Sequence, residues 1–328
     1  MKSNHLDYLP LDKLQEKNIL VTGASGLIGS AIVEFLLENT SAEVYAMFRN
    51  RDVGEFRFKK HLQNSKLHFI LGDVNEPLAT KHTFHYIIHA ASNANPTTYS
   101  TDPVGTIWTN INGTRNLLEY GRRHSLERFL YISSGEVYGN GEQSVWSESD
   151  CGFIDNLDAR SCYPSSKRTA ETLCLCYADQ YNVDVVIARP CHTYGPSFTD
   201  NDNRAYAQFV RKARDKQDII LKSSGEQFRS WIYIEDCVMG ILTVLLNGKN
   251  NNAYNIADEA SNVTIKHMAE TIAQIAGTKV IFQIPDTLES KGYSKMQRAI
   301  FDTSKLQELG WAPKYSLKQG LYNTIYNI

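Results

Sequence analysis

Short apolar runs alternate with helix-like segments along the first two thirds of the chain. The apolar runs occupy residues 18–22, 43–48, 67–71, 86–89, 129–133 and 183–189. Runs this short, with nearly every position apolar, are typical of parallel strands buried on both faces. In residues 31–37, 104–120 and 164–180 the apolar positions recur instead at the spacing of a helix. The alternation predicts an α/β fold built on a parallel sheet.

The pattern changes after about residue 190, where strands and helices no longer alternate regularly. Residues 206–214 have helical periodicity, residues 227–233 suggest extended chain, and Asp236 precedes another apolar helix pattern. A chain of 328 residues is long enough for one large domain or two smaller ones.

The composition is that of an ordinary soluble globular protein, with 42% hydrophobic and 21% charged residues. A net charge of -2 and the lack of a basic tract disfavour nucleic acid as a partner. No apolar run approaches the roughly 20 residues of a membrane span, so we expect no membrane association. Six cysteines in a chain this long do not resemble a disulfide framework. We therefore expect a reduced, cytoplasmic protein without a metal site.

A glycine-rich turn follows the first apolar run and precedes a helical pattern. Strand, glycine turn and helix in this order favour a dinucleotide-binding unit over a plain turn. The first glycine allows the tight turn, the second lets a pyrophosphate approach the backbone, and the third allows close packing of the helix. The helix N-terminus then favours the phosphate charge. We expect cofactor contacts from Gly23, Ser25, Gly26, Leu27, Ile28 and Gly29.

The residues that follow the second, third and fourth predicted strands are expected to hold the rest of the dinucleotide. NAD-binding proteins usually place a carboxylate after the second strand, whereas this chain has Arg49 there. Arg49 would suit the 2′-phosphate of NADP, although it would also suit stacking on adenine or facing solvent, so NAD stays open. Asp73 is placed to accept from the adenine amino group, with Val74 beside it. Small residues that suit a close approach to the dinucleotide follow the fourth strand: Ala90, Ala91 and Ser92.

Candidate catalytic groups follow the fifth strand and open the next long helix. Ser134 and Glu136 lie at the carboxyl end of a predicted parallel strand, where open α/β sheets place their sites. Ser134 would form a hydrogen bond with the hydroxyl being oxidised, and Glu136 would act as a base or an orienting group. The alternative is that both residues only form hydrogen bonds within the turn. Tyr163 and Lys167 are four residues apart, so they lie one helical turn apart on the same face. A nearby cation favours a phenolate, so the pair predicts a proton acceptor for a sugar or alcohol hydroxyl.

These motifs together resemble the extended short-chain dehydrogenase/reductases that act on nucleotide sugars, the NAD-dependent epimerase/dehydratase group. The stretches Arg-Pro-x-x-x-Tyr-Gly-Pro at 189–196 and Arg-Ser-Trp-x-Tyr-x-x-Asp at 229–236 add to the resemblance. Residues 160–174 are locally most similar to UDP-glucuronate decarboxylases. The resemblance covers nearly all of the chain, and it implies a nucleotide-diphosphate sugar as substrate and NAD or NADP as cofactor.

The resemblance also implies an architecture. The expected fold is a Rossmann-type doubly wound parallel sheet with a smaller C-terminal α/β lobe for the substrate. The dinucleotide-binding domain is expected at residues 1–190 plus about 229–258, and the nucleotide-sugar lobe at about 191–228 plus 259–328. Family members usually dimerise through two helices from each subunit, so we expect a homodimer through 104–120 and 164–180.

The resemblance assigns roles to individual residues. Ser134, Tyr163 and Lys167 match the family's catalytic trio. Tyr163 would take the hydroxyl proton as hydride passes to the nicotinamide, while Lys167 would hold the nicotinamide ribose and favour the ionised Tyr163. Pro190 is expected beside the cofactor. Arg229 matches an arginine that grips the diphosphate, for which a planar cation is well suited.

Two positions depart from the family pattern. Before the glutamate that Glu136 matches, dehydratases have an aspartate that protonates the departing C6 hydroxyl, and decarboxylases have a serine. This chain has Gly135, which can neither donate a proton nor bond a carboxylate. His192 stands where the family usually has an asparagine that touches phosphate or sugar. A histidine near its reference pKa of about 6.5 would add pH-dependent charge, unless it only packs near the phosphates.

We therefore expect an epimerase that oxidises a sugar hydroxyl, at C4, with a bound dinucleotide. One alternative is a UDP-glucuronate decarboxylase or 4,6-dehydratase in which a water fills the gap beside Gly135. Another is a keto-sugar reductase or dehydrogenase that exchanges free NADP(H). A non-catalytic dinucleotide sensor is disfavoured, because a sensor needs none of Ser134, Tyr163 and Lys167.

Overall fold

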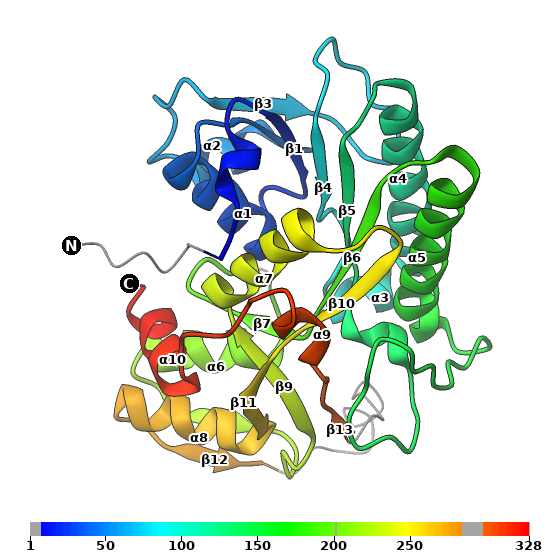
Figure 1. The fold of residues 1–328 in the computed structure, drawn as a ribbon. Helices are drawn as coiled ribbons and strands as arrows, with labels where there is room; N and C mark the ends of the chain where they lie inside the picture. Colours follow the sequence, from blue (N-terminus) through cyan, green and yellow to red (C-terminus); the bar gives the residue numbers. More distant parts are fainter. Residues whose placement is uncertain (1–7, 201, 284–297, 328) are drawn as a thin grey trace.

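A seven-stranded parallel sheet organises residues 8–200, 202–283 and 298–327, the part of the chain that the computed structural model describes. Its strand order is β10-β6-β5-β4-β1-β2-β3, and every neighbouring pair is parallel (Figure 1). The strands are β1 (Asn18–Thr22), β2 (Glu43–Phe48), β3 (Leu67–Leu71), β4 (Tyr86–His89), β5 (Arg128–Ile132), β6 (Val185–Pro190) and β10 (Asn252–Ile256). The predicted doubly wound sheet is therefore confirmed, and β10 is a strand that the apolar pattern did not predict.

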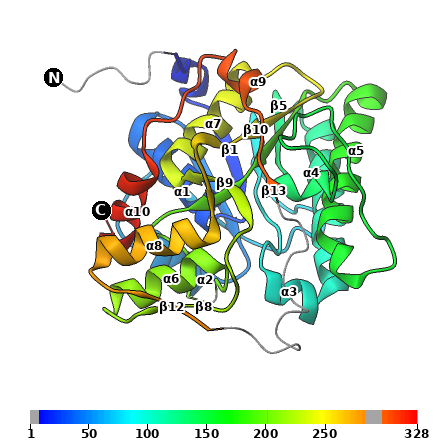
Figure 2. The same cartoon turned by 90° about the horizontal axis from the view of Figure 1, so that it is seen from below.

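Helices cover both faces of this sheet (Figures 1 and 2). α1 (Leu27–Asn39) and α7 (Ile234–Asn247) pack together on one face, and α4 (Pro103–Arg123) and α5 (Cys162–Tyr181) pack together on the other. The shorter α2 (Arg51–Arg57) and α3 (Pro96–Thr101) follow β2 and β4. The predicted helices at 104–120 and 164–180 correspond to α4 and α5.

The two helical layers explain why whole strands are apolar. Neighbouring residues of a strand point to opposite faces. Leu130 and Ile132 belong to the core cluster that contains α1 and α7, whereas Phe129 and Tyr131 belong to the cluster that contains α4 and α5. Because both faces of the sheet are covered, each strand buries consecutive side chains.

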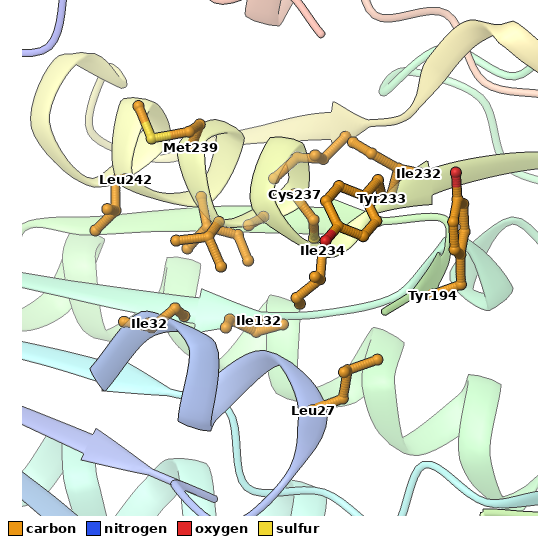
Figure 3. Packing of buried hydrophobic residues seen from close by; sticks show 14 of the residues in the cluster. Leu27, Ile32, Ile132, Tyr194, Ile232, Tyr233, Ile234, Cys237, Met239 and Leu242 are labelled. Carbon is orange, nitrogen blue, oxygen red and sulfur yellow. The ribbon is translucent and has the colours of Figure 1, made fainter. Parts of the chain in front are cut away.

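The packing between α1 and α7 brings residues that are far apart in sequence into one core. Figure 3 shows Leu27 and Ile32 of α1 on one side of this core, and Cys237 and Leu242 of α7 on the other. All four side chains are nearly or fully buried. The glycine turn before α1 is thereby held against the C-terminal half of the chain.

A smaller lobe is built from the chain after β6. Its four-stranded sheet contains β7 (His192–Tyr194), β9 (Phe228–Tyr233), β11 (Asp258–Thr264) and β13 (Arg298–Ala299). A two-stranded sheet pairs β8 (Ile219–Leu221) with β12 (Val280–Phe282). The helices are α6 (Ala205–Arg214), α8 (Ile265–Ala276) and α10 (Leu317–Tyr326), while α9 (Ser304–Gln307) contacts β10 and α7.

Within the described residues, the chain leaves the large sheet for the small lobe from β6 to β7 and from β10 to β11, and it returns from β9 to α7. β9 pairs within the small sheet, whereas α7 and β10 belong to the large unit. The predicted domain boundaries stay a prediction, and their segments 1–7, 284–297 and 328 lie outside the described residues.

A buried ion pair joins several elements near the end of β6. Arg189 donates to both carboxylate oxygens of Glu171 on α5, at 2.9 and 2.7 Å. It also donates to the hydroxyl of Tyr138 at 3.0 Å and to the backbone carbonyl of Glu148 at 3.1 Å. The Tyr138 hydroxyl donates in turn to Asn255 of β10 at 2.6 Å. One guanidinium therefore ties α5, β6 and β10 to the loop after β5.

We expect Glu171→Ala to lower the free energy of unfolding by about 3–4 kcal/mol, because it leaves the guanidinium of Arg189 buried without its counter-charge. The side chains of this pair are only 13% and 9% exposed. Urea unfolding followed by circular dichroism measures the change. Glu55→Ala, which breaks the exposed pair of Arg51 and Glu55, is the control and should cost less than about 0.5 kcal/mol. Equal, small effects of both variants would contradict the structural role of Glu171.

Candidate active site

The glycine turn between β1 and α1 lies directly against the end of β4. Gly23 has a φ of +65°, a conformation that favours glycine. A Cβ atom at this position would lie 2.7 Å from backbone atoms of both Ala90 and Ala91. A Cβ at Gly29 would overlap the carbonyl oxygen of Gly23. The structure thus brings the predicted glycine turn and the small residues after β4 together.

The N-terminus of α1 is suited to an anion. Gly26 is its N-cap residue and provides no side-chain cap, and the first turn contains no acidic residue. The first N–H groups of a helix lack intrahelical acceptors and favour negative charge. A thirteen-residue helix that begins this way fits the pyrophosphate of a dinucleotide. Gly26, Leu27 and Ile28 are the residues that would hold it.

Arg49 and Asp73 lie together at the carboxyl ends of β2 and β3. The Arg49 side chain is 70% exposed, and its Nη1 lies 4.0 Å from Oδ2 of Asp73. Oδ1 of Asp73 accepts from the backbone and side-chain N–H groups of Asn75 at 2.9 and 3.0 Å. Arg49 therefore has its guanidinium available to an incoming phosphate, but beside a carboxylate that partly balances its charge.

The segment after β4 is fixed to the helices behind it. Ser92 donates to Oδ1 of Asn110 on α4 at 2.7 Å. The side-chain amide of Asn110 donates to Ser166 on α5 at 2.9 Å. On the other side, Ala91 donates its backbone N–H to the hydroxyl of Thr22 at 3.3 Å. These contacts hold the expected cofactor residues between β1, α4 and α5.

The predicted catalytic trio is brought to one place. Tyr163 and Lys167 lie in the first turns of α5, and both are buried, at 5% and 2% exposure. Lys167 donates to the backbone carbonyl of Ile132 at 2.8 Å, directly before the segment that contains Ser134. The hydroxyl of Ser134 accepts from the backbone N–H of Glu136 at 3.2 Å, and Ser134 also lies within hydrogen-bonding reach of Tyr163.

The expectation that Lys167 gives Tyr163 a low pKa is not met in this structure. Burial raises the pKa of Tyr163 to about 12, and the negative charge of Glu136 raises it further. Burial also lowers the pKa of Lys167 to about 7, although Glu171 opposes this shift. The ammonium lies 5.8 Å from the centre of the Tyr163 ring and donates to Ile132 instead. Desolvation therefore outweighs the attraction that the four-residue spacing predicts.

Two residues that sequence reasoning did not assign surround these groups. Arg160 donates to both carboxylate oxygens of Glu136, at 3.2 and 3.1 Å. Its guanidinium also lies 4.5 Å from the centre of the Tyr99 ring. Tyr99 stacks on Tyr163 with ring centres 4.6 Å apart and an interplanar angle of 23°.

The small lobe contributes its own polar groups to this region. His192 of β7 is paired with Trp231 of β9, so Arg229, two residues earlier in β9, lies on the same face of the small sheet. Arg229 is 5% exposed, and burial lowers its pKa to about 10, while the charge of Glu136 acts in the opposite direction. The positive charge of Arg204, at the start of α6, favours the phenolate of Tyr163 and disfavours protonation of His192.

The surroundings of His192 oppose the change of charge that its reference pKa predicts near neutral pH. Its side chain is exposed to solvent, although the neighbouring protein partly desolvates the ring. Burial together with Arg229 and Arg204 lowers the pKa of His192 to about 3. The ring is therefore neutral near pH 7 in this structure, and it meets a ligand as a neutral hydrogen-bonding group.

The space beside Gly135 is filled by an aromatic ring, not open to water. A Cβ at this position would overlap Cζ of Phe301 and lie 2.8 Å from its Cε2. Phe301 is 3% exposed and packs on Tyr138, with ring centres 5.4 Å apart. Its backbone forms a bridge to Trp146 and donates to Ser230 at 3.2 Å. A water in the place of that side chain, as the decarboxylase or dehydratase alternative supposes, would collide with this ring.

Sequence reasoning missed Tyr99, Arg160 and Arg204 for different reasons. Arg160 lies three residues before Tyr163, inside the stretch that carries the strongest local resemblance, so that stretch was an available signal. Tyr99 and Arg204 follow no local pattern. They reach Tyr163 only because α3 and the start of α6 fold over the same edge of the sheet.

A glycine turn against β4, an α1 without a side-chain cap and a buried pair of Tyr163 and Lys167 fit a dinucleotide-dependent site. A family model described as the NAD-dependent epimerase/dehydratase family matches residues 19–257. The chain belongs to this family. The family identity confirms the predicted nucleotide-sugar enzyme class and the predicted dependence on NAD or NADP.

Individual proteins that are similar to the chain are also named as enzymes of nucleotide sugars. A UDP-glucuronic acid decarboxylase of Arabidopsis thaliana is 34% identical over 92% of this chain and 86% of its own length. A solved dTDP-glucose 4,6-dehydratase of Streptomyces venezuelae is 26% identical with a TM-score of 0.81, over 94% of this chain and 96% of that one. A solved UDP-glucuronic acid 4-epimerase of Bacillus cereus is 25% identical with a TM-score of 0.79, over 94% and 99%. Among the described residues of the present chain, no helix is long and apolar enough to cross a membrane.

Proposed function

We propose that the protein is an epimerase of this family that oxidises a hydroxyl of a nucleotide-diphosphate sugar, at C4, and returns the hydride to the opposite face of the resulting ketone, which inverts that carbon. The substrate would lie between the glycine turn and the small-lobe face that carries His192 and Arg229. UDP sugars are the first substrates to test, because the related decarboxylase and 4-epimerase are named for them.

The observation that carries this proposal is the pairing of Gly135 with Phe301. Position 135 has no side chain, and the Phe301 ring occupies the space in which one would lie. The proton-transferring groups at the site are then Tyr163, with Ser134 beside it, and Glu136. An inversion needs no further acid for a leaving group, whereas loss of water does.

Each candidate residue has its own role in the proposed reaction. Tyr163 accepts the proton of the sugar hydroxyl and returns it after inversion, while Ser134 orients that hydroxyl. Lys167 is held by Ile132 at the foot of Tyr163, where its ammonium would bind the nicotinamide ribose. The bound dinucleotide supplies the acceptor and donor of hydride. Glu136 orients the sugar or removes a proton next to the transient ketone.

Arg229 and His192 are proposed to hold the diphosphate. Arg229 is buried and lies on the same face of the small sheet as His192, which is accessible. An arginine fork binds phosphate oxygens in two places, and a neutral imidazole donates one hydrogen bond. We propose Arg49 as a contact to the adenosine end, where it would favour NADP over NAD.

Decarboxylation of UDP-glucuronate is the second candidate. The 34% identity to a UDP-glucuronic acid decarboxylase over 92% of the chain favours it. The Gly135 and Phe301 pair argues against it, because no side chain at position 135 is available to bond the carboxylate.

The deciding experiment is mass spectrometry of a panel of nucleotide sugars, incubated in deuterated water with the protein and with NAD or NADP. We expect a new isomer, with deuterium only if Glu136 removes a carbon-bound proton, and without it if hydride return alone inverts C4.

Tyr163→Phe should lose at least about 100-fold in kcat, because the base is absent, and still bind the dinucleotide.

Each other product would replace the proposal with a named alternative. Loss of carbon dioxide from UDP-glucuronate would make the protein a decarboxylase, and loss of water would make it a dehydratase. A two-mass-unit change coupled to free cofactor would make it a dehydrogenase or reductase. Retention of wild-type activity in Tyr163→Phe would remove Tyr163 as the base.

A second prediction concerns Gly135 itself. We expect Gly135→Ser alone to be destabilised, because its Cβ collides with Phe301. Gly135→Ser combined with Phe301→Leu removes the colliding Cε and Cζ atoms and should fold. Carbon dioxide release from UDP-glucuronate that begins only in this double variant would identify the pair as the element that directs the reaction. Thermal melts and the same mass assay measure both effects, with Phe301→Leu alone as control.

We propose that the protein forms a homodimer through α4 and α5. These two helices form an outer layer of the molecule (Figure 2). Val104 and Trp108 are one turn apart on α4 and remain 62% and 51% exposed, and Leu175 and Tyr181 of α5 are each 40% exposed. Large apolar side chains are thus exposed at both ends of this helical layer, and exposed apolar surface is typical of an interface.

Trp108→Glu should therefore convert a dimer into a monomer, because a carboxylate at this position would be buried unpaired in the interface. Sedimentation velocity at matched concentrations measures the mass. Leu157→Glu is the matched control, since Leu157 is 98% exposed on a loop outside these helices and should leave the mass unchanged. A monomeric parent protein would refute the proposed dimer.

A cytoplasmic location is also proposed. All six cysteines are free thiols in the structure, including the buried Cys162, Cys174 and Cys237. Free thiols are typical of a reducing compartment.

A further inference from the structure

A chain of three contacts leads from Glu136 to Tyr163 through residues that the proposed reaction does not use. Arg160 bonds both oxygens of Glu136 and lies over the ring of Tyr99. Tyr99 in turn stacks on Tyr163. Tyr99 is 3% exposed and Tyr163 is 5% exposed, so the stacked pair is closed to solvent, while Arg160 remains partly accessible.

We propose that Arg160 is a positioning residue: it holds the Glu136 carboxylate and the Tyr99 ring at once, and so fixes how Glu136 and Tyr163 face each other across the site. The catalytic meaning of this proposal rests on the proposed function, in which Tyr163 is the base. Arg160 itself needs no contact with the sugar.

The local structure explains why Arg160 can do this. It lies in the short 3-10 turn η3 (Ala159–Ser161) that leads directly into α5, and Oδ1 of Asp158 accepts its backbone N–H at 2.9 Å. Glu136 lies in a second 3-10 turn, η2 (Gly135–Tyr138), which begins at Ser134. Arg160 is therefore the side-chain link between the two turns that present Glu136 and Tyr163.

The electrostatic consequence follows from the same geometry. The charge of Glu136 opposes ionisation of Tyr163 and raises its pKa. A guanidinium 3.1–3.2 Å from both carboxylate oxygens reduces that effect, because the ion pair is nearly neutral when seen from Tyr163. Without Arg160, the carboxylate would lose its hydrogen-bonded counter-charge, with only the more distant charge of Arg229 acting on it, and it would be free to turn.

Other charged and titratable groups also face Tyr163, and apart from Tyr99 none of them contacts Arg160 in the described part of the chain. They come from α3, β5, α5 and the start of α6: Tyr99, Tyr131, Lys167 and Arg204. Arg204 is held by Asp202, at 3.0 and 2.6 Å, so it has its own counter-charge. Replacement of Arg160 therefore changes chiefly how strongly the charge of Glu136 acts on Tyr163.

A purely structural role for Arg160 predicts something different. Arg168 provides the comparison, because it also anchors η2, through backbone carbonyls of Val137 and Tyr138 at 2.5 and 3.1 Å. Arg168 bonds no oxygen of Glu136 in the described residues. Loss of either arginine would loosen the loop, but only loss of Arg160 would change the charge that Tyr163 meets.

The test follows ionisation of Tyr163 in Arg160→Met, Arg160→Lys, Glu136→Gln, the double variant Arg160→Met/Glu136→Gln, and Arg168→Met. The first readout is tyrosinate absorbance against pH in protein loaded with oxidised dinucleotide but no sugar, with Tyr163→Phe subtracted to remove the other tyrosines. The cationic nicotinamide ring favours the phenolate and brings its ionisation into an accessible range. The second readout is the rising limb of kcat/KM against pH with a sugar found in the panel.

Tyr163 must be ionised to accept a proton, so a higher pKa moves the rising limb to higher pH. We expect Arg160→Met to shift the midpoint upward by about one pH unit, and Glu136→Gln to shift it downward. The double variant should lie close to Glu136→Gln, because without the carboxylate there is no charge left for Arg160 to balance. Arg160→Lys should restore the midpoint, and Arg168→Met should leave it unchanged even if it lowers kcat.

An unshifted midpoint in Arg160→Met would overturn the proposal, as would an equal shift in Arg168→Met. An upward shift that persists in the Glu136→Gln background would also overturn it. The two readouts separate this proposal from the proposed function. Absorbance shifts as expected without turnover of any sugar would leave the positioning role standing and reject the epimerase, whereas turnover with an unshifted midpoint would do the reverse.

Discussion

The buried pair of Arg189 and Glu171 is the contact on which the arrangement of the active site depends. It fixes α5, which carries Tyr163 and Lys167, to the end of β6. Through Tyr138 it also fixes the turn that presents Ser134 and Glu136. Asn255 extends the network to Trp146 and Asp302, beside Phe301. Candidate catalytic groups from distant segments thus share one anchor, which limits their relative motion.

Burial, more than any single pair of charges, sets the protonation states at this site. It keeps Tyr163 protonated, favours a neutral Lys167 and leaves His192 uncharged near pH 7. Arg160 and Glu136 form one balanced pair at the site, and Arg204 and Asp202 form another. A site of this kind gains charge when a dinucleotide and a diphosphate arrive. The ligands therefore take part in activating the groups that act on them.

Much of the large sheet and its cofactor turn was predictable, because the relevant signals are local. Six strands appear as apolar runs since both faces of the sheet are covered, and the glycine turn follows from spacing alone. The small lobe was harder to predict. β7 and β13 are too short to show a period, and β9 becomes recognisable as an interior strand only when β7, β11 and β13 pair with it. The proximity of Tyr99 and Arg204 to Tyr163 has no sequence signal, because Tyr163 is more than thirty residues from both.

By itself the sequence determined the parallel α/β sheet, the dinucleotide turn, the four-residue spacing of Tyr163 and Lys167, and the absence of a side chain at Gly135. These properties depend on residue type and on spacing within one or two elements. Only the tertiary structure decided that Phe301 fills the space beside Gly135, that burial reverses the expected pKa of Tyr163, and that Arg160 links Glu136 to Tyr99. The physical reason is that desolvation and steric exclusion are properties of everything that surrounds a group, and a linear chain does not specify its neighbours until it folds.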